Sequence, residues 1–412
     1  MRITEADGLI VCLAMCLLGV GIVMVYSSDW ASSLGVKGSS MTLLRHMLAL
    51  LLGAGAVGGL VWLDYRRLEP LGYIFLGVAI VGLIVVLVPG IGHLHGGARR
   101  WIRFGPMMGF QPSEFAKLAL VLFLATWASR NHGRMHEFLR GFLLPALAIG
   151  TLVALTLLEP DFGTGTFLGA LGIMLLLVAG ARWVYVVLSV LLATPILYFL
   201  IYQAAYRKAR LLAFLDPWND PSGVGYHIIQ SWIALGSGGV LGKGLGEGLQ
   251  KLLFLPECSG DFIFAVVGEE LGFLGTFAII VFFALLVWQG FRVSQRAKEP
   301  FGRLLSLGIT FMLGYQAAFN MAVVLGCVPT KGIALPFISS GGSSLLLSLT
   351  ALGLLLSVAR HSRGAEVMYS WRPVRQRQIR GGGRLSLSGL PFRPLNLFQG
   401  KEGLHYRAGM RR

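Results

Sequence analysis

The chain has 412 residues, of which 55% are hydrophobic and only 13% are charged, and its mean hydropathy is +0.72. Soluble domains carry about 25% charged residues, so this composition excludes a soluble globular protein and indicates a chain that crosses a membrane several times. The formal net charge of +16 comes largely from short loops and a basic C-terminal segment, so nucleic-acid binding is not required to explain it.

Ten apolar segments are long enough to cross the hydrocarbon layer of a membrane, which takes roughly 20 helical residues. Backbone polar groups in lipid must bond to one another, so each segment is predicted to be a helix and the fold class to be an all-α polytopic membrane protein. The first segment lacks a convincing cleavage site, which favours a retained helix over a removed signal peptide. The predicted spans are 8–27, 44–63, 70–88, 112–128, 141–158, 165–181, 183–203, 262–288, 304–326 and 336–359.

The distribution of Lys and Arg predicts which connections face the cytoplasm, because basic residues stay preferentially on that side. With ten spans, both termini are predicted to be cytoplasmic, together with the loops that contain Arg66, Arg130, Arg182 and Arg292. Two basic clusters fall on the opposite side and therefore need a functional reason. They are Arg99, Arg100 and Arg103 after the third span, and Arg207, Lys208 and Arg210 after the seventh.

The chain is predicted to form one membrane domain over residues 1–360 and a basic cytoplasmic tail over 361–412. The tail combines many Arg with Gly, Pro and Ser, which is typical of disorder. Two roles remain open for it: a solvated segment near anionic lipid, or a docking segment for a cytoplasmic partner.

One long loop, about residues 204–261, separates the seventh and eighth spans and is predicted to lie outside. The apolar spacing from Ile228 to Leu235 predicts an amphipathic helix within it, ended by the glycine-rich residues 236–239. Loops of this length are commonly functional.

Ionisable residues at the ends of the apolar segments are costly in a membrane and gather in the predicted outer half. Glu114 and Lys117 are three residues apart, so they share a helical face and can pair, either as a structural ion pair or to hold the lysine for a substrate. Asp161 lies in a tight turn, where it caps a helix or contacts a ligand. Asp261 stands where a polar run turns into the eighth span. Glu269 follows at a spacing that favours the same helical side, either as part of the site or as a buried structural hydrogen-bond hub.

The last outer connection combines Lys331 with small polar residues, including Ser339 and Ser343, around a Gly-Gly pair. Such a segment is predicted to unwind a helix or to pack closely against another one, and irregular backbone at this depth is tolerated where it lines a cavity.

Eight short motifs follow one another along residues 10–360. They are GARRW (97–101), QPSEFAK (111–117), EPDFGT (159–164), DPW (216–218), LPE (255–257), DFIFA (261–265), GEELG (268–272) and the run 329–344. In this order they resemble one family: the SEDS proteins of shape, elongation, division and sporulation, which are peptidoglycan glycosyltransferases of the bacterial inner membrane.

Residues 246–252 are more similar to the division type (FtsW) or its sporulation relative than to the elongation type (RodA). The chain departs from the family at Ser340, where Tyr is usual, and at 258–260, where His-Thr usually precedes the acid.

The resemblance implies that a disaccharide-peptide is transferred from an undecaprenyl-diphosphate carrier to the 4-hydroxyl of N-acetylglucosamine in lipid II. It also implies a class B penicillin-binding protein as a transpeptidase partner, other divisome proteins, and a place in the inner membrane at the division septum.

Asp261 is the candidate general base, because an outward carboxylate within hydrogen-bond reach can accept the proton of the attacking hydroxyl. The diphosphate leaving group calls for cations, and the candidates are Arg99, Arg100, Lys117, Arg207, Arg210 and Lys331. Further candidates for substrate contact are Trp101, Glu114, Asp161, Glu257, Glu269, Ser339 and Ser343. A divalent cation, Mg²⁺ or Mn²⁺, is compatible with this chemistry, but the sequence contains no recognisable ligand spacing for it.

Two other function classes remain open. Intramembrane carboxylates are also found in transporters, so a flippase for lipid-linked precursors is one alternative, although no inverted repeat is visible. A non-catalytic division scaffold that recruits partners is the other. The concentration of charge on one face and the long outer loop before Asp261 favour the enzyme.

Overall fold

The structure is a computed structural model that describes residues 5–34, 41–95, 98–105, 108–203, 205–252, 254–255 and 258–369. Most of the predicted basic tail lies outside these residues.

Each of the ten predicted spans is occupied by a helix, and eight of the described helical segments are long and apolar enough to cross a membrane. This confirms an all-α polytopic membrane protein. The ten helices are α1 (Glu5–Leu34), α2 (Met41–Trp62), α3 (Gly72–Leu87), α4 (Pro112–Arg130), α5 (Leu144–Leu158), α6 (Phe162–Val178), α7 (Trp183–Gln203), α10 (Ile263–Arg296), α11 (Pro300–Val324) and α12 (Gly342–Tyr369).

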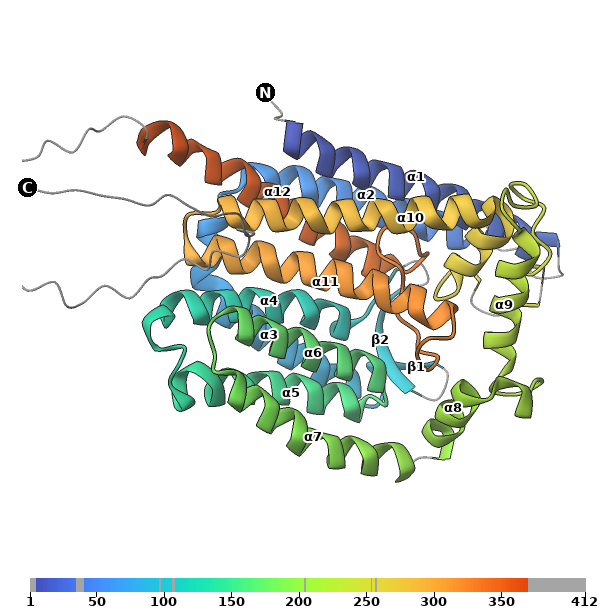
Figure 1. Ribbon diagram of the computed structural model, residues 1–412, viewed down its shortest axis with the longest axis horizontal. Helices are drawn as coiled ribbons and strands as arrows, with labels where there is room; N and C mark the ends of the chain where they lie inside the picture. The colour runs from blue at the N-terminus through green and yellow to red at the C-terminus, as the bar shows by residue number, and fades with distance from the viewer. Residues whose placement is uncertain are drawn as a thin grey trace, which may run out of the picture. The chain divides into compact units, whose positions relative to one another are not determined.

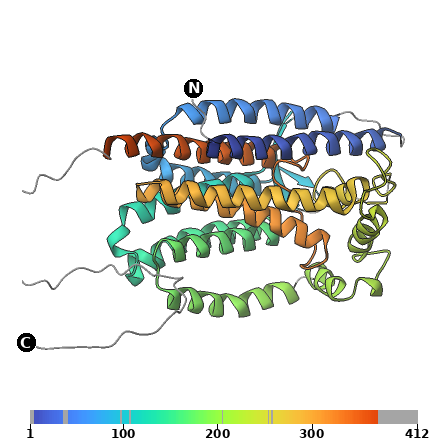
Figure 2. The ribbon, with the colours of Figure 1, turned by 45° about the horizontal axis from the view of Figure 1, so that its top comes forward.

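The helices run side by side in a bundle (Figures 1 and 2). Helix α2 packs along α12, α10 along α11, α3 along α4, and α4 also contacts α11. Helix α4 is buried around most of its circumference, which places it inside the bundle, whereas α7 exposes most of its apolar side chains, as expected for a lipid-facing helix.

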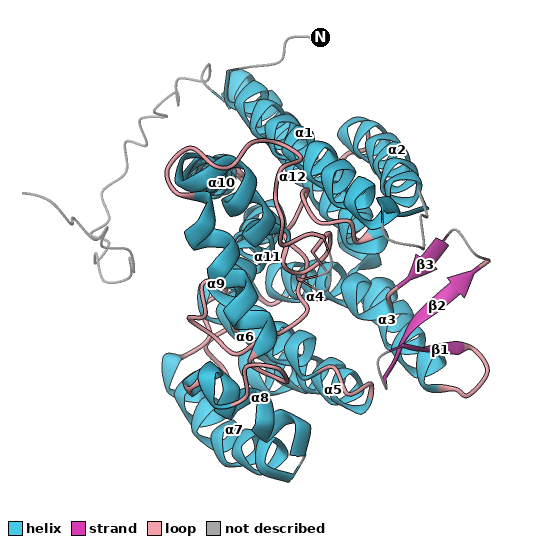
Figure 3. Cartoon of the chain, turned by 90° about the vertical axis from the view of Figure 1, so that its right-hand side faces the viewer, coloured by secondary structure: helices cyan, strands magenta, loops and turns pink. Residues whose placement is uncertain are grey.

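Shorter elements gather at the two ends of the bundle. One end, which faces the viewer in Figure 3, holds an antiparallel sheet of β1 (Gly92–His95), β2 (Ala98–Phe104) and β3 (Met108–Phe110), together with α8 (Ala205–Leu215), η4 (Pro217–Asn219) and α9 (Tyr226–Gly238). The other end holds η1 (Tyr65–Leu71), η2 (His132–Arg134) and η3 (Phe138–Leu143). There, Arg66 Nε lies 2.8 Å from Glu299 Oε1, so two connections predicted on the same side of the membrane do meet. The small sheet was not predicted from the sequence.

Helix α9 confirms the amphipathic helix predicted in the long loop. Its buried residues include Ile228, Ile229 and Ala234, and its packing partner is α10. The helix ends at Gly238, and the next residue, Gly239, has a φ of 56°, a conformation that favours glycine.

The last span begins six residues later than predicted, since 336–341 form an irregular segment and α12 starts at Gly342. The physical reason is that the Ser339 hydroxyl accepts a hydrogen bond from the Leu335 N–H at 2.8 Å and donates one to Gly260 O at 2.8 Å. Side-chain hydroxyls that bond the local backbone in this way compete with helix formation.

Helix α10 is broken at Gly272, where φ is 67° and ψ is −163°. The main-chain groups released by the break bond to the glycine-rich residues 239–244 instead, with Lys243 N donating to Glu269 O at 3.0 Å and Phe273 N donating to Gly239 O at 2.9 Å. This break, which the sequence did not predict, fixes the end of the long loop against α10.

Candidate active site

Asp261 lies in an irregular turn just before α10, and segments remote in sequence hold this turn in place. The Asn320 amide of α11 donates to Asp261 O at 2.8 Å. The Ser339 hydroxyl donates to Gly260 O at 2.8 Å, and Ser340 N donates to Ser259 O at 2.9 Å. The main chain on both sides of the carboxylate is therefore tied to α11 and to the segment before α12.

The carboxylate of Asp261 lies against the backbone next to Lys331. A Cβ atom built on Gly332 would stand 2.5 Å from Asp261 Oδ2, so any other residue at this position would require the carboxylate to shift. Asn320 also donates to Ile333 O at 2.7 Å. The structure thus brings the Asp261 carboxylate to the main chain directly after Lys331, a residue predicted from a distant motif.

Lys331 is half-buried among aromatic and charged neighbours. Its Nζ lies 4.7 Å from the ring centroid of Phe162, an arrangement that favours a cation. Burial lowers the pKa of Lys331 to about 8, Asp161 opposes this shift, and Arg210, Arg100 and Arg207 lower the pKa further. The crowding of positive charge around the ammonium predicts a strong attraction for an anion.

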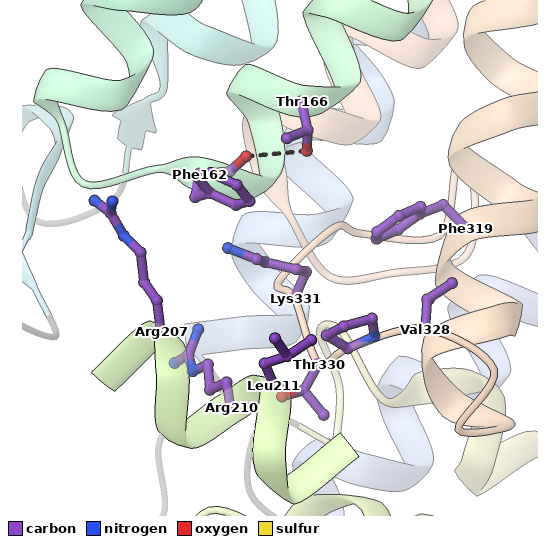
Figure 4. A pocket seen from close by; sticks show the side chains of 10 residues that line it. Phe162, Thr166, Arg207, Arg210, Leu211, Phe319, Val328, Thr330 and Lys331 are labelled. Carbon is purple, nitrogen blue, oxygen red and sulfur yellow. Dashed lines mark hydrogen bonds between the residues drawn. The ribbon is translucent and has the colours of Figure 1, made fainter. Parts of the chain in front are cut away.

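A cavity of about 230 Å³ opens beside Lys331. Three cations reach its lining, Arg207 and Arg210 from α8 and Lys331 from the segment after α11 (Figure 4). The rest of the lining is largely apolar and comprises Phe162, Thr166, Leu211, Phe319, Val328, Pro329 and Thr330. A pocket with cations on an apolar wall suits a ligand that joins an anionic group to a hydrocarbon chain. Among the described residues, Asp261 does not line this cavity; it lies across Gly332 from it.

Arg100 and Asp161 shape the turn that borders this cluster. From strand β2, Arg100 donates from Nε to Glu159 O at 3.3 Å and from Nη2 to Pro160 O at 2.5 Å. Asp161 caps α6 by accepting bonds from the N–H and hydroxyl of Thr164, at 3.2 and 2.9 Å.

Glu159, which the sequence reasoning did not select as a site residue, is fully buried in the same turn. Burial raises the pKa of its carboxyl to about 8, the nearby Asp161 raises it as well, and Arg100 opposes the shift. The raised pKa favours the protonated, uncharged form of this acid near neutral pH, which reduces the negative charge beside the cations.

The remaining candidates lie elsewhere. Lys117 Nζ lies 2.7 Å from Glu114 Oε1, the pairing that their spacing predicted, and it also donates to Gln316 at 3.1 Å inside the bundle. The carboxylate of Glu269 accepts hydrogen bonds from Lys243, Leu249 N and Gln250 N, so it anchors the long loop. Glu269 is therefore a buried structural hydrogen-bond hub, one of the two roles expected for it. Asp261 precedes the first turn of α10, so helical spacing does not relate the two residues.

The last four candidates have the following positions. Trp101 packs over Gly109 within the small sheet, and Arg99 belongs to strand β2 next to Arg100. Ser343 is buried in the first turn of α12, and its hydroxyl has no hydrogen-bond partner among the described residues. Glu257 lies outside the described residues.

A profile of the FtsW, RodA and SpoVE family, described as cell cycle protein, matches residues 7–364. The chain belongs to this family. It is 43% identical over 364 residues to the probable peptidoglycan glycosyltransferase FtsW of Geobacter metallireducens, covering 88% of this chain and 97% of that protein. It is 40% identical over 363 residues to the stage V sporulation protein E of Bacillus subtilis, covering 87% of this chain and 98% of that protein.

Solved structures share the fold of this family member. A peptidoglycan synthase complex, described for its coordination of polymerization and crosslinking, contains a chain that matches with a TM-score of 0.70 and 29% identity, covering 86% of this chain and 97% of that one. The rod shape determining protein RodA of Thermus thermophilus matches with a TM-score of 0.63 and 29% identity, covering 86% and 96%.

Two amide side chains of α11, Gln316 and Asn320, belong to the site but were not predicted from the sequence. Gln316 donates to Ala334 O at 2.9 Å and accepts from Lys117, and Asn320 bridges Asp261 O and Ile333 O. Both are buried, and they are four residues apart on one helical face. Buried polar groups in a membrane helix are costly unless they are hydrogen-bonded, so this spacing of amides within an apolar segment was an available signal.

The described residues contain no group of three or more His, Cys, Asp or Glu side chains that could hold a metal ion. A protein site with a single carboxylate still fits Mg²⁺, which commonly takes one or two carboxylates and completes its shell with water and substrate phosphate.

Proposed function

We propose that this chain polymerises lipid II into glycan strands at the outer face of the bacterial cytoplasmic membrane during cell division. Its family and its 43% identity to a probable peptidoglycan glycosyltransferase make it a glycosyltransferase of peptidoglycan synthesis. The observation that carries the assignment of the site is the position of the Asp261 carboxylate against the main chain of Gly332, the residue that follows Lys331.

In the proposed reaction, the 4-hydroxyl of the acceptor N-acetylglucosamine attacks C1 of the donor N-acetylmuramic acid. The new C1–O bond forms while the bond between C1 and the phosphate oxygen breaks. Asp261 takes the hydroxyl proton and later releases it to water, and the electron pair of the broken bond leaves on undecaprenyl diphosphate. A carboxylate suits this role because it can accept a proton from a hydroxyl group that comes within hydrogen-bond reach.

The cations have a separate role, which is to stabilise the charge that develops on the leaving diphosphate. Lys331, Arg207 and Arg210 converge on one cavity, so their positive charges would act together on a diphosphate bound there. The apolar lining, which includes Phe162 and Phe319, would hold the first units of the lipid chain. Arg100 acts at the border of this cluster by holding the turn at Glu159 and Pro160. Asp261 would hold a divalent ion, which would supply further positive charge for the leaving diphosphate.

The proposal places both termini in the cytoplasm and the sheet, α8 and α9 on the outer side. The gathering of these elements at one end of the bundle, and of the loops with Arg66, Arg130 and Arg182 toward the other, supports this orientation. We also propose a class B penicillin-binding protein and other divisome proteins as partners at the septum. The likeness to a chain of a peptidoglycan synthase complex supports a partnership of this kind.

The experiment is reconstitution of the purified full chain in liposomes with fluorescent lipid II and Mg²⁺, with and without a class B transpeptidase. We expect a glycan polymer from the wild type and none from Asp261→Asn. Movement of lipid II across the bilayer without polymer would instead identify a flippase. Binding of the transpeptidase with neither polymer nor lipid movement would identify a scaffold.

A further inference from the structure

We infer that Asn320 is a positioning residue that sets the distance between the candidate base, Asp261, and the cation, Lys331. This inference rests on the proposed function and extends it to a residue of α11 whose side-chain amide bonds to main-chain carbonyl oxygens of the site. The amide nitrogen of Asn320 donates to Asp261 O at 2.8 Å and to Ile333 O at 2.7 Å. One NH₂ group therefore bridges the main chain of the base and the main chain two residues after Lys331.

The bridge matters because neither functional residue is held by regular secondary structure. Asp261 lies in a turn before α10, and Lys331 lies in the irregular segment between α11 and α12. Asn320 itself belongs to α11, whose main chain is fixed by helical hydrogen bonds. A rigid helix thus serves as the common reference for two irregular segments. A displacement of about 1 Å in such a site can lower a rate by roughly 100-fold.

The hydrogen bonding of Asn320 is one-sided, which points to a role beyond stability. The residue is 1% exposed, and both hydrogen atoms of its amide are used. Its Oδ1, in contrast, has no hydrogen-bond partner among the described residues. A buried acceptor without a partner costs free energy, so a residue selected for stability alone would satisfy both ends or be apolar.

Gln316, one helical turn away, performs a different task and shows that the bridge of Asn320 is specific. It bonds to Ala334 O, Ser344 Oγ and Lys117, and so links α4 to the start of α12. Of the two amides, Asn320 alone bonds to the main chain of Asp261.

The test compares Asn320→Ala and Asn320→Asp with a control, Thr126→Ala. Thr126 is equally buried and donates to a main-chain carbonyl, that of Glu69, at the opposite end of the bundle. We expect kcat for lipid II polymerisation to fall roughly tenfold or more in both Asn320 variants, with KM changed less than about threefold, since they misplace the reacting groups without removing a substrate contact. Thermal midpoints should match that of Thr126→Ala, which keeps the wild-type kcat.

A double-variant cycle separates positioning from general damage. If Asn320 acts by placing the segment that carries Lys331, then adding Asn320→Ala to Lys331→Ala should lower kcat much less than Asn320→Ala does in the wild type. The inference would be overturned if the double variant lowered kcat by the product of the two single-variant factors. It would also be overturned if the kcat of Asn320→Ala stayed within about twofold of the wild-type value. The proposed function would fail differently, through a wild type that makes no polymer or an Asp261→Asn variant that makes it at the wild-type rate.

Discussion

At the scale of single residues, Lys331 shows how the surroundings tune a cation. Its pKa is lowered to about 8 by burial and by the neighbouring arginines. The amine carries its positive charge below this value and loses it as the pH rises through it. We expect kcat/KM of the wild type, which reports on the free enzyme, to fall as the pH rises through about 8.

The matched variant is Lys331→Arg, because a guanidinium stays charged throughout this range. We measure initial rates between about pH 6 and 10 at constant ionic strength. In this variant the fall of kcat/KM on the alkaline side should occur at a higher pH than in the wild type. A fall at the same pH in both proteins would assign it to another group.

Gly332 gives a second residue-scale prediction. A Cβ at this position would stand 2.5 Å from Asp261 Oδ2, so Gly332→Ala should push the carboxylate out of place and lower the polymerisation rate at least tenfold, or about 1.4 kcal/mol in activation free energy. Gly341→Ala is the control in the same segment, since its Cβ would meet its nearest neighbours at 3.4 and 3.7 Å, ordinary contact distances. Equal rates for the two variants would contradict the placement of Asp261.

At the scale of elements, the long loop is fastened to the break in α10 by buried ion pairs. Lys251 and Glu270 have side chains that are 0% exposed, with Nζ 2.5 Å from Oε1, and Ser27 of α1 bonds to both. Lys251→Met would leave the carboxylate buried without its partner. We expect a loss of about 3–5 kcal/mol in the free energy of unfolding, measured in detergent.

Two comparisons test that explanation. The double variant Lys251→Met/Glu270→Leu should recover much of the loss, because no unpaired charge remains. Arg66→Ala removes two ion pairs, to Glu299 and to Asp64, whose side chains are between 29% and 43% exposed, and it should cost only about 0–1 kcal/mol. A Lys251→Met loss as small as that of Arg66→Ala would show that the buried pair does not hold the loop.

The ten spans and α9 could be predicted from the sequence because apolar length and helical spacing are local signals. The sheet at β1–β3 and the break at Gly272 could not. The strands are short, and the break is stabilised by hydrogen bonds to residues 239–244, which no window along α10 contains. The late start of α12 depends likewise on a bond from Ser339 to Gly260, far away in sequence.

The candidate site was predicted in part, and for a similar reason. Charges on the disfavoured side of the membrane identified Arg207 and Arg210, and the last outer connection identified Lys331. The structure gathers all three around one cavity. The position of Asp261 relative to this cluster depends on Gly332 and Asn320. The sequence did not indicate their roles, because these residues contact Asp261 from segments that are remote along the chain. Lys117 carries the same charge but is enclosed by Glu114 and Gln316, a difference that composition cannot reveal.

At the scale of the whole molecule, the account requires that the sheet, α8 and α9 face outward. The measurement is labelling by a membrane-impermeant maleimide in intact cells, in a variant whose free cysteines, Cys12, Cys16, Cys258 and Cys327, are replaced by Ser. We expect Trp218→Cys, at a position whose side chain is 64% exposed beside α8, to be labelled directly. His132→Cys, exposed at the other end, should react only after permeabilisation. The reverse pattern would place the site in the cytoplasm.

The central claim is that Asp261 accepts the proton of the attacking hydroxyl. The most direct test is the single-turnover rate of glycosidic bond formation at saturating lipid II, with Asp220→Asn as a control that changes an exposed acid of the same outer loop. We predict that Asp261→Asn binds lipid II but forms the bond about 100-fold or more slowly, the usual contribution of a general base, while Asp220→Asn keeps the wild-type rate. An Asp261→Asn rate within about threefold of the wild type would contradict the account.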